Sequence, residues 1–193
     1  MIKEEFFPTI IYAKDVNLNN KLFEQEIVSW SRQDKGITKT NVNGWHSTTD
    51  MHTIPVFKPL VDELFKMVHQ VFNEEFLDKR PVLGNMWANI NPSGGYNKPH
   101  VHPNALFSGV YYVKTPPNCG RLICQDPRPG IQTCMPTRKK EKPPKYLWRD
   151  VHLQPQENRA IIFPAWLWHA GEPNESNDIR ISVSFNFIQD GFQ

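Results

Sequence analysis

Cysteine is scarce in this chain, and long apolar runs are missing. The 193 residues include three cysteines, Cys119, Cys124 and Cys134, without the C-x-x-C spacing typical of zinc sites. This odd number favours reduced thiols over disulfides. The longest apolar stretches fall far short of the roughly 20 residues that a membrane span needs. Residues 1–5 lack the apolar core of a secretion signal. We therefore expect a cytoplasmic protein without a membrane partner.

A strong excess of charge of either sign is also absent. Lys and Arg total 22 against 20 Asp and Glu, which gives a formal charge of +2. This balance is too mild to predict binding to nucleic acid or to an anionic surface. A hydrophobic content of 39% argues against a disordered chain, and the length suits one domain over residues 1–193.

The first eighty residues predict a helical flank. The apolar run Phe6–Tyr12 could form an edge strand, although Pro8 limits its pairing. Asn17 is a plausible N-cap of a first helix, whose apolar side would hold Leu18, Leu22, Ile27 and Trp30. A second helix is expected from about Val56. Its apolar positions recur every three or four residues: Leu60, Val61, Leu64, Val68, Val71 and Phe72.

From Leu83 onward the apolar period changes to two, which is typical of strands. Further strands are expected at residues 105–114, 120–125, 151–154, 159–163 and 179–188. Turn residues separate these strands, and no helical pattern lies between them. The pattern predicts a mainly β protein with N-terminal helices, in which residues 83–193 form an antiparallel sandwich or jelly roll.

The segment 126–150 interrupts this β region. It contains five prolines and seven Lys or Arg residues. A loop of this length inside a compact domain is usually a functional lid or a disordered segment, and the sequence leaves both open. Its basic residues could meet an acidic substrate or could simply be solvated.

Three histidines carry the main chemical signal. His100 and His102 are separated by one residue, and His169 follows an apolar run much further along the chain. Positions i and i+2 of a strand point the same way, so the pair suits a strand end, with the third ligand on a spatial neighbour. Mononuclear Fe(II) oxygenases use three protein ligands and leave the opposite face of the metal open. Each histidine alone would be interpreted as structural, but together they predict a metal site.

Arg180 is the first residue of the stretch 180–187, in which polar and apolar residues alternate. A guanidinium binds a carboxylate through two parallel hydrogen bonds, and Ser182 on the same face can add a hydroxyl donor. The alternative is a surface ion pair with Asp178 or Glu175. The opposite face is apolar and should pack away from the site: Ile181, Val183, Phe185 and Phe187.

Several segments together resemble the Fe(II)/2-oxoglutarate-dependent dioxygenases, and within them a family of oxygenases from bacteria and phages with an H-x-H-P motif. The matching segments are Asn43–Ser47, His100–Pro103, Ser108–Val113, Phe163–Asn174 and Arg180–Ser182. The resemblance implies a double-stranded β-helix (a cupin-like jelly roll) with Fe(II), 2-oxoglutarate and O2. It implies hydroxylation of a C–H bond while 2-oxoglutarate is decarboxylated to succinate.

One position departs from the superfamily's H-x-D pattern, because His102 stands where the aspartate is expected. His102 either completes a three-histidine site or only lines the cavity, as in the aspartyl/asparaginyl hydroxylases, where this position is a non-ligating glycine. Asp126 is an alternative third ligand, or it anchors the loop together with Arg128. Tyr111 and Asn89, on flanking strands, are candidates to hydrogen-bond 2-oxoglutarate.

The remaining histidines lack a partner at a useful spacing and are expected to be structural: His46, His52, His69 and His152. Trp166 and Trp168 flank His169 and should shield the metal. The sequence favours an oxygenase acting on a protein side chain, a peptide or a small molecule. Two rivals are a cupin-type three-histidine enzyme without 2-oxoglutarate and a catalytically silent jelly-roll binding protein. The oligomeric state stays open, a homodimer included.

Overall fold

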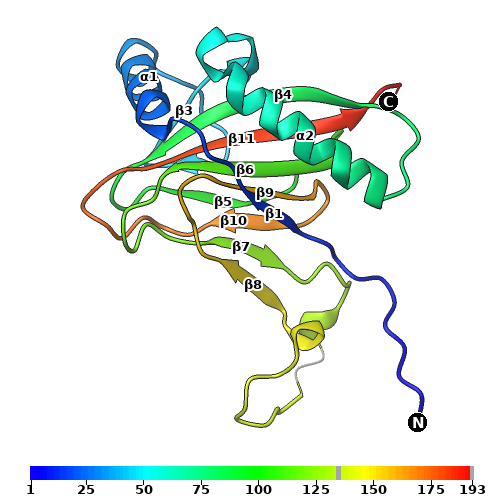
Figure 1. Cartoon of the computed structure of the whole chain (residues 1–193). Coiled ribbons are helices and arrows are strands. Elements are labelled where there is room, and N and C mark those ends of the chain that lie inside the picture. The colour runs from blue at the N-terminus through cyan, green and yellow to red at the C-terminus, as the bar shows by residue number, and fades with distance from the viewer. Residues whose placement is uncertain (134–135, 192–193) are drawn as a thin grey trace.

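Two antiparallel sheets face each other, and two helices cover the outer side of the larger one (Figure 1). The computed structural model describes residues 1–133 and 136–191. The larger sheet has the order β1-β9-β6-β11-β4-β3, and the smaller has the order β2-β5-β10-β7-β8. From β4 to β11 successive strands lie in different sheets, apart from the β7–β8 pair, which is the jelly-roll arrangement that the sequence predicts.

The strands of the larger sheet are β1 (Tyr12–Asp15), β3 (Trp45–His46), β4 (Pro81–Asn91), β6 (Phe107–Lys114), β9 (Arg159–Pro164) and β11 (Arg180–Gln189). Those of the smaller sheet are β2 (Asn41–Val42), β5 (Tyr96–His100), β7 (Leu122–Gln125), β8 (Asp150–Leu153) and β10 (His169–Gly171). The helices are α1 (Asn20–Gln33) and α2 (Lys58–Glu74), with short 3-10 turns at Met51–Thr53, Pro55–Phe57, Ile131–Thr133 and Lys145–Leu147.

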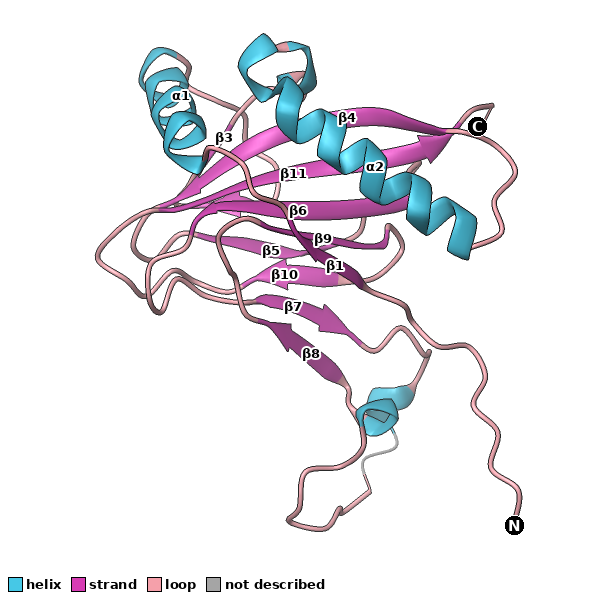
Figure 2. Cartoon of the chain, in the orientation of Figure 1, coloured by secondary structure: helices cyan, strands magenta, loops and turns pink. Residues whose placement is uncertain are grey.

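The main core lies between α2 and the larger sheet (Figure 2). Leu64 and Val68 of α2 are buried in one cluster with the apolar residues of β11, and Phe65 meets the ring of Phe187 edge-on at 5.3 Å. The expected stripe on this helix is confirmed, and Met67 belongs to it as well. Packing of this stripe fixes the outer face of the sheet and leaves the inner face for other side chains.

Two predictions in the N-terminal flank are wrong in detail. Helix α1 is capped by Asn19, whose side chain accepts a hydrogen bond from Leu22 N at 3.2 Å, not by Asn17. Its buried residues are Phe23 and Ile27. Three asparagines follow one another closely here, so composition alone did not select the cap. The edge strand β1 begins only at Tyr12, at the end of the apolar run expected to form it.

The segment 126–150 projects from the β7–β8 edge, away from the helices (Figure 1). At its base Asp126 N donates to Arg149 O at 2.6 Å. None of its described residues lines the cavity that lies between the two sheets beside the three histidines. A lid would have to cover that cavity, so the structure does not place the segment as a lid.

Cys119 and Cys124 are buried and free, while Cys134 lies outside the described residues. No helix within residues 1–133 and 136–191 is long and apolar enough to cross a membrane.

Candidate metal centre

The three predicted histidines meet at one point between the sheets. His100 ends β5, His169 begins β10, and the two are Cα partners in the pairing of these strands. His102 lies just beyond β5, where its backbone N–H donates to Ala165 O at 3.0 Å. One nitrogen from each of the three rings lies within 4.8 Å of the others. The chain therefore brings together imidazoles that are distant in sequence.

Backbone carbonyls orient two of the rings. His100 Nδ1 lies 2.7 Å from Lys98 O, and His169 Nδ1 lies 2.8 Å from Leu167 O. A carbonyl oxygen can only accept, so each Nδ1 carries the proton and each Nε2 presents a lone pair. Metal-ligating histidines are commonly held this way by an outer hydrogen bond.

Burial keeps these rings neutral. It is the main cause that lowers the pKa of His102 to about 3 and that of His169 to about 4, with the neighbouring histidines adding to the shift. Burial also lowers the pKa of His100. Neutral imidazole is the form that binds a metal ion, so the site needs no deprotonation near neutral pH.

The donor set fits a divalent transition metal. His102 Nε2 and His169 Nε2 are 3.2 Å apart, close to the roughly 3 Å expected for two nitrogens at right angles around a metal with bonds of about 2.1 Å. Imidazole nitrogens suit iron among other metals. Asp126 is not part of this cluster: its carboxylate accepts hydrogen bonds at 2.9, 3.2 and 2.5 Å from the guanidinium of Arg128.

A cavity of about 280 Å³ extends from the histidines between the sheets. Its larger-sheet wall consists of inward-facing side chains of β4, β6 and β11. They are Asn85, Trp87, Asn89, Val110, Tyr112, Arg180, Ser182, Ser184 and Asn186. This wall is mostly polar, unlike the apolar outer face of the same strands.

Arg180 lies at one end of this wall and is 4% exposed. Its Nη1 donates to Cys119 O at 2.6 Å and to the carbonyls of Gly120 and Glu172 at 3.2 Å. Within the described residues it makes no ion pair, so the surface pair with Asp178 or Glu175 is wrong. One guanidinium nitrogen is thus fixed by the backbone, while Nε and Nη2 make no hydrogen bond in the described chain. A buried cation without an anion fits a site for a carboxylate.

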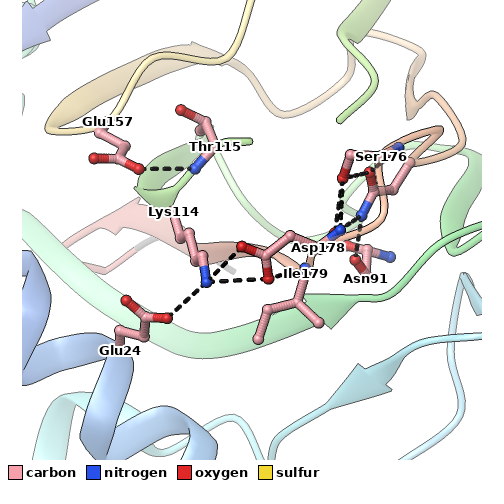
Figure 3. Close-up of polar contacts among 9 residues, drawn as sticks. Glu24, Asn91, Lys114, Thr115, Glu157, Ser176, Asp178 and Ile179 are labelled. Carbon is pink, nitrogen blue, oxygen red and sulfur yellow. Dashed lines mark hydrogen bonds and ion pairs between the residues drawn. The ribbon is translucent and has the colours of Figure 1, made fainter. Parts of the chain in front are cut away.

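A network of polar contacts fixes the loop that leads into β11 (Figure 3). Asn174 Nδ2 donates to Asn91 O at 2.8 Å and to Asp178 O at 2.7 Å. Lys114 lies between Glu24 of α1 and Asp178, at 2.9 Å from a carboxylate oxygen of each. These contacts set where β11 begins, and with it the position of Arg180.

Tyr111, predicted to hydrogen-bond 2-oxoglutarate, does not line the cavity, whereas its neighbour Tyr112 does. Tyr111 faces away from the cavity, and its hydroxyl donates to Asn20 Oδ1 at 2.5 Å and lies 3.0 Å from Asn158 Oδ1. Tyr112 lines the cavity instead, on the strand position paired with Ser182. Burial raises the pKa of Tyr112, so its hydroxyl stays protonated and can donate. Seven of the eight residues of β6 are buried, so no polar alternation marks the inner face.

Ser182 and Asn89 reach the cavity as predicted. They are Cα partners in the β4–β11 pairing, and both are buried. The Ser182 hydroxyl makes no hydrogen bond within the described chain. Asn89 Nδ2 donates to Ser184 Oγ at 3.2 Å, and Asn89 Oδ1 is buried without a partner there.

His46 and Tyr112 are among the cavity residues that sequence reasoning missed, and two tryptophans were misplaced. His46 was expected to be structural, yet it lines the cavity and stacks on Trp87 with a ring separation of 5.4 Å. His46 reaches the cavity because β3 pairs with β4, and no local spacing in the sequence reveals this pairing. Trp166 and Trp168 are about half exposed and do not line the cavity, so they do not shield the histidines from solvent as expected.

The fold is similar to that of several solved oxygenases. A prolyl-4-hydroxylase from Pseudomonas putida aligns with a TM-score of 0.63 at 13% identity, over 95% of this chain and 94% of that chain. The viral collagen prolyl hydroxylase from Paramecium bursaria Chlorella virus-1, in complex with 2-oxoglutarate, gives 0.59 at 14% identity, over 92% and 94%. HygX from Streptomyces hygroscopicus, with nickel and 2-oxoglutarate bound, gives 0.64 at 12% identity, over 96% and 85%. These likenesses establish the jelly-roll fold.

A search among curated proteins found no match. A family model described as "Putative 2OG-Fe(II) oxygenase" matches residues 85–186, more than half of the chain. The matched span runs from β4 into β11 and contains all three clustered histidines and Arg180. The chain therefore belongs to this family of 2-oxoglutarate- and Fe(II)-dependent oxygenases.

Proposed function

We propose that His100, His102 and His169 together hold the Fe(II) of this oxygenase. The observation that supports this most directly is the convergence of three neutral imidazoles in the cavity that also contains the unpaired cation of Arg180. His102 occupies the position of the usual aspartate, and the fixed Asp126–Arg128 pair leaves no carboxylate in the cluster. The centre is thus a three-histidine variant of the family's site.

The larger-sheet wall would bind 2-oxoglutarate. Arg180 would pair with its distal carboxylate, since a buried guanidinium with free Nε and Nη2 groups offers two parallel donors. Ser182 and Tyr112 would add hydroxyl donors from the adjacent positions of β11 and β6. Tyr112 takes the part that the sequence assigned to Tyr111. The cupin-type rival gives Arg180 no carboxylate to bind.

The reaction would be hydroxylation of a C–H bond. With iron bound, O2 would oxidise 2-oxoglutarate to succinate and CO2, and the second oxygen atom would enter the substrate C–H bond as a hydroxyl. The chain's own contribution is to hold the oxo acid and to limit water in a cavity between two sheets. The proposed substrate is a protein side chain, a peptide or a small molecule. Residues 1–193 would act as one oxygenase domain, and the free buried cysteines support a reducing, cytoplasmic setting.

Anaerobic titration tests this proposal. Fe(II) and 2-oxoglutarate added to the purified protein should produce a metal-to-ligand absorption band at one iron per chain. His100→Ala and His169→Ala should each abolish stoichiometric iron retention, because each removes a ligand with a fixed orientation. Parent-like iron binding in both variants would show that the centre is misplaced.

The role of His102 needs its own pair of variants. His102→Ala should weaken iron binding greatly, whereas His102→Asp should retain it, because a carboxylate restores the usual ligand set. If His102→Ala binds iron like the parent, His102 only lines the cavity. Asp126→Asn serves as the control, and its iron affinity should match that of the parent.

A further inference from the structure

Two hydrogen-bond acceptors stand side by side on the cavity wall near the metal centre. His46 of β3 and Asn89 of β4 are directly opposite in the pairing of these strands. Cβ atoms of opposed residues in an antiparallel pair lie about 4.5–5.5 Å apart, so the two side chains emerge next to each other. Both line the cavity, and they are only 5% and 4% exposed.

The acceptor of Asn89 is its side-chain oxygen. Its amide nitrogen is directed to Ser184 Oγ, while Oδ1 is fully buried and makes no hydrogen bond within the described chain. Buried polar atoms are nearly always paired, and an unpaired one next to a cavity indicates a ligand or a bound water. A carboxylate offers only acceptors, so 2-oxoglutarate cannot satisfy this oxygen.

The acceptor of His46 is Nε2. Its Nδ1 lies 2.6 Å from Ser47 O, which can only accept, so Nδ1 carries the ring proton. Burial lowers the pKa of His46, which keeps the ring neutral and leaves a lone pair on Nε2. Nε2 has no hydrogen-bond partner in residues 1–133 and 136–191. His46 stacks on Trp87, whose ring lies 5.7 Å from that of His102, so one indole ring contacts both His46 and the metal centre.

The charge of the cavity decides which donor fits. Its described lining includes the cations Lys39 and Arg180, together with Arg121, which is paired with Glu172 outside the lining, but no Asp or Glu. A protonated amine would meet repulsion there, and a group without N–H or O–H would leave both acceptors unpaired. An uncharged amide NH2 group has two protons to donate, one for each acceptor, whereas a hydroxyl has only one.

We propose that His46 and Asn89 bind the uncharged NH2 group of a primary carboxamide on the substrate, beside the C–H bond to be hydroxylated. This inference rests on the proposed function, because it takes the histidine cluster as the reacting centre. It reassigns Asn89 from the co-substrate to the substrate.

Small probes test the donor requirement without knowledge of the substrate. In isotopically labelled protein, the Asn89 side-chain amide and the His46 ring signals are followed by NMR during titration with acetamide, N,N-dimethylacetamide or methylammonium. Acetamide should cause saturable shifts at both residues. N,N-dimethylacetamide, which keeps the carbonyl but has no N–H, and methylammonium should bind at least five-fold more weakly. Equal binding of N,N-dimethylacetamide would mean that the wall offers donors, and tighter binding of methylammonium would mean that it selects cations; either result overturns the proposal.

Variants assign the effect to the two side chains. His46→Phe keeps the stack on Trp87 but removes Nε2, and it should weaken acetamide binding at least five-fold. Asn89→Asp keeps an acceptor in the same shape and should preserve acetamide binding while improving that of methylammonium. Thr49→Val, elsewhere on the cavity lining, is the matched control and should bind acetamide like the parent. Parent-like binding by His46→Phe contradicts the inference.

The titration of Fe(II) and 2-oxoglutarate on the same samples separates this inference from the proposed function. If the parent protein loads both but shows no selectivity among the probes, only the amide assignment fails. If the parent protein does not load iron, the proposed metal centre fails instead.

Discussion

The two faces of β11 differ completely, although they share one backbone. The residues facing α2, Ile181, Val183, Phe185 and Phe187, are fully buried and apolar. The residues facing the cavity are Arg180, Ser182, Ser184 and Asn186. On the neighbouring strand β4, Asn89 and Asn91 hold three of the four buried side-chain polar atoms that lack a hydrogen bond in the described chain. Apolar side chains pack closely on the outer face, whereas polar groups on the inner face lack hydrogen-bond partners within the described chain.

This difference separates stability from binding within a single sheet. Apolar contacts on the outer face stabilise the fold whether or not a ligand is bound. Unpaired polar groups on the inner face cost free energy until a ligand supplies partners. Substitutions on the two faces should therefore change different measurements.

The largest effect is expected on the packed face. Phe185→Ala removes a fully buried ring and should lower the free energy of unfolding by about 3–5 kcal/mol. Denaturant unfolding followed by tryptophan fluorescence measures this loss. The folded protein should still bind 2-oxoglutarate with an affinity close to that of the parent. If Phe185→Ala lost 2-oxoglutarate affinity but kept its stability, the outer face would contribute to binding and not to stability, which contradicts the assignment.

The cavity face should respond in the opposite way. Arg180→Ala should weaken 2-oxoglutarate binding by orders of magnitude, roughly 2–5 kcal/mol if the pair behaves like other buried charge pairs. Arg180→Lys should be intermediate, because an ammonium lacks the planar fork of a guanidinium. The anaerobic absorption titration measures both, and iron binding should survive. Equal 2-oxoglutarate affinity in parent and Arg180→Ala would remove the co-substrate assignment.

The adjacent tyrosines of β6 give the same contrast on a smaller scale. Tyr111→Phe loses the hydrogen bond to Asn20 and should cost about 1 kcal/mol of stability, with 2-oxoglutarate affinity retained. Tyr112→Phe should weaken 2-oxoglutarate binding several-fold, with a smaller effect on unfolding. If Tyr111→Phe weakened 2-oxoglutarate binding and Tyr112→Phe lowered stability instead, Tyr111 and not Tyr112 would face the cavity.

A further effect concerns pH and the metal-free protein. The pKa values of His102 and His169 are lowered by burial to about 3 and about 4, so the unfolded chain binds more protons than the folded one below about pH 6.5. Stability should then be complete above this pH and fall as the pH decreases towards 4. Melting temperatures between pH 7.5 and 5 measure the slope, which should be shallower in His102→Gln. A melting temperature that rises on acidification would contradict the direction of these shifts.

Sequence patterns predicted the fold and the group of three histidines because both depend on strong, simple signals. The period-two strands, the apolar stripe of α2 and the i, i+2 pair His100 and His102 need no tertiary information. Arg180 and Ser182 were found because β11 alternates cleanly between polar and apolar residues.

The sequence predictions were wrong where contacts between distant segments determine the position of a side chain. Tyr111 and Tyr112 cannot be distinguished by pattern, because β6 is buried on both faces. His46 joins the cavity only through the two-residue strand β3, which pairs it with Asn89 far along the chain. The exposed Trp166 and Trp168 lie in the turn between β9 and β10, whose direction no periodicity fixes.

The hydrogen bond from Asp126 to Arg149 has a practical consequence. It brings the two ends of the segment 126–150 together at the β7–β8 edge, so the chain between them forms an appendage whose length does not affect strand pairing. Loop closure becomes only slightly more costly as a loop is lengthened. Exposed loop tips generally tolerate insertions, and Lys139 and Lys140 are both exposed. The junction between these two lysines is therefore a natural place to insert an affinity tag or a fluorescent reporter while the oxygenase barrel stays intact.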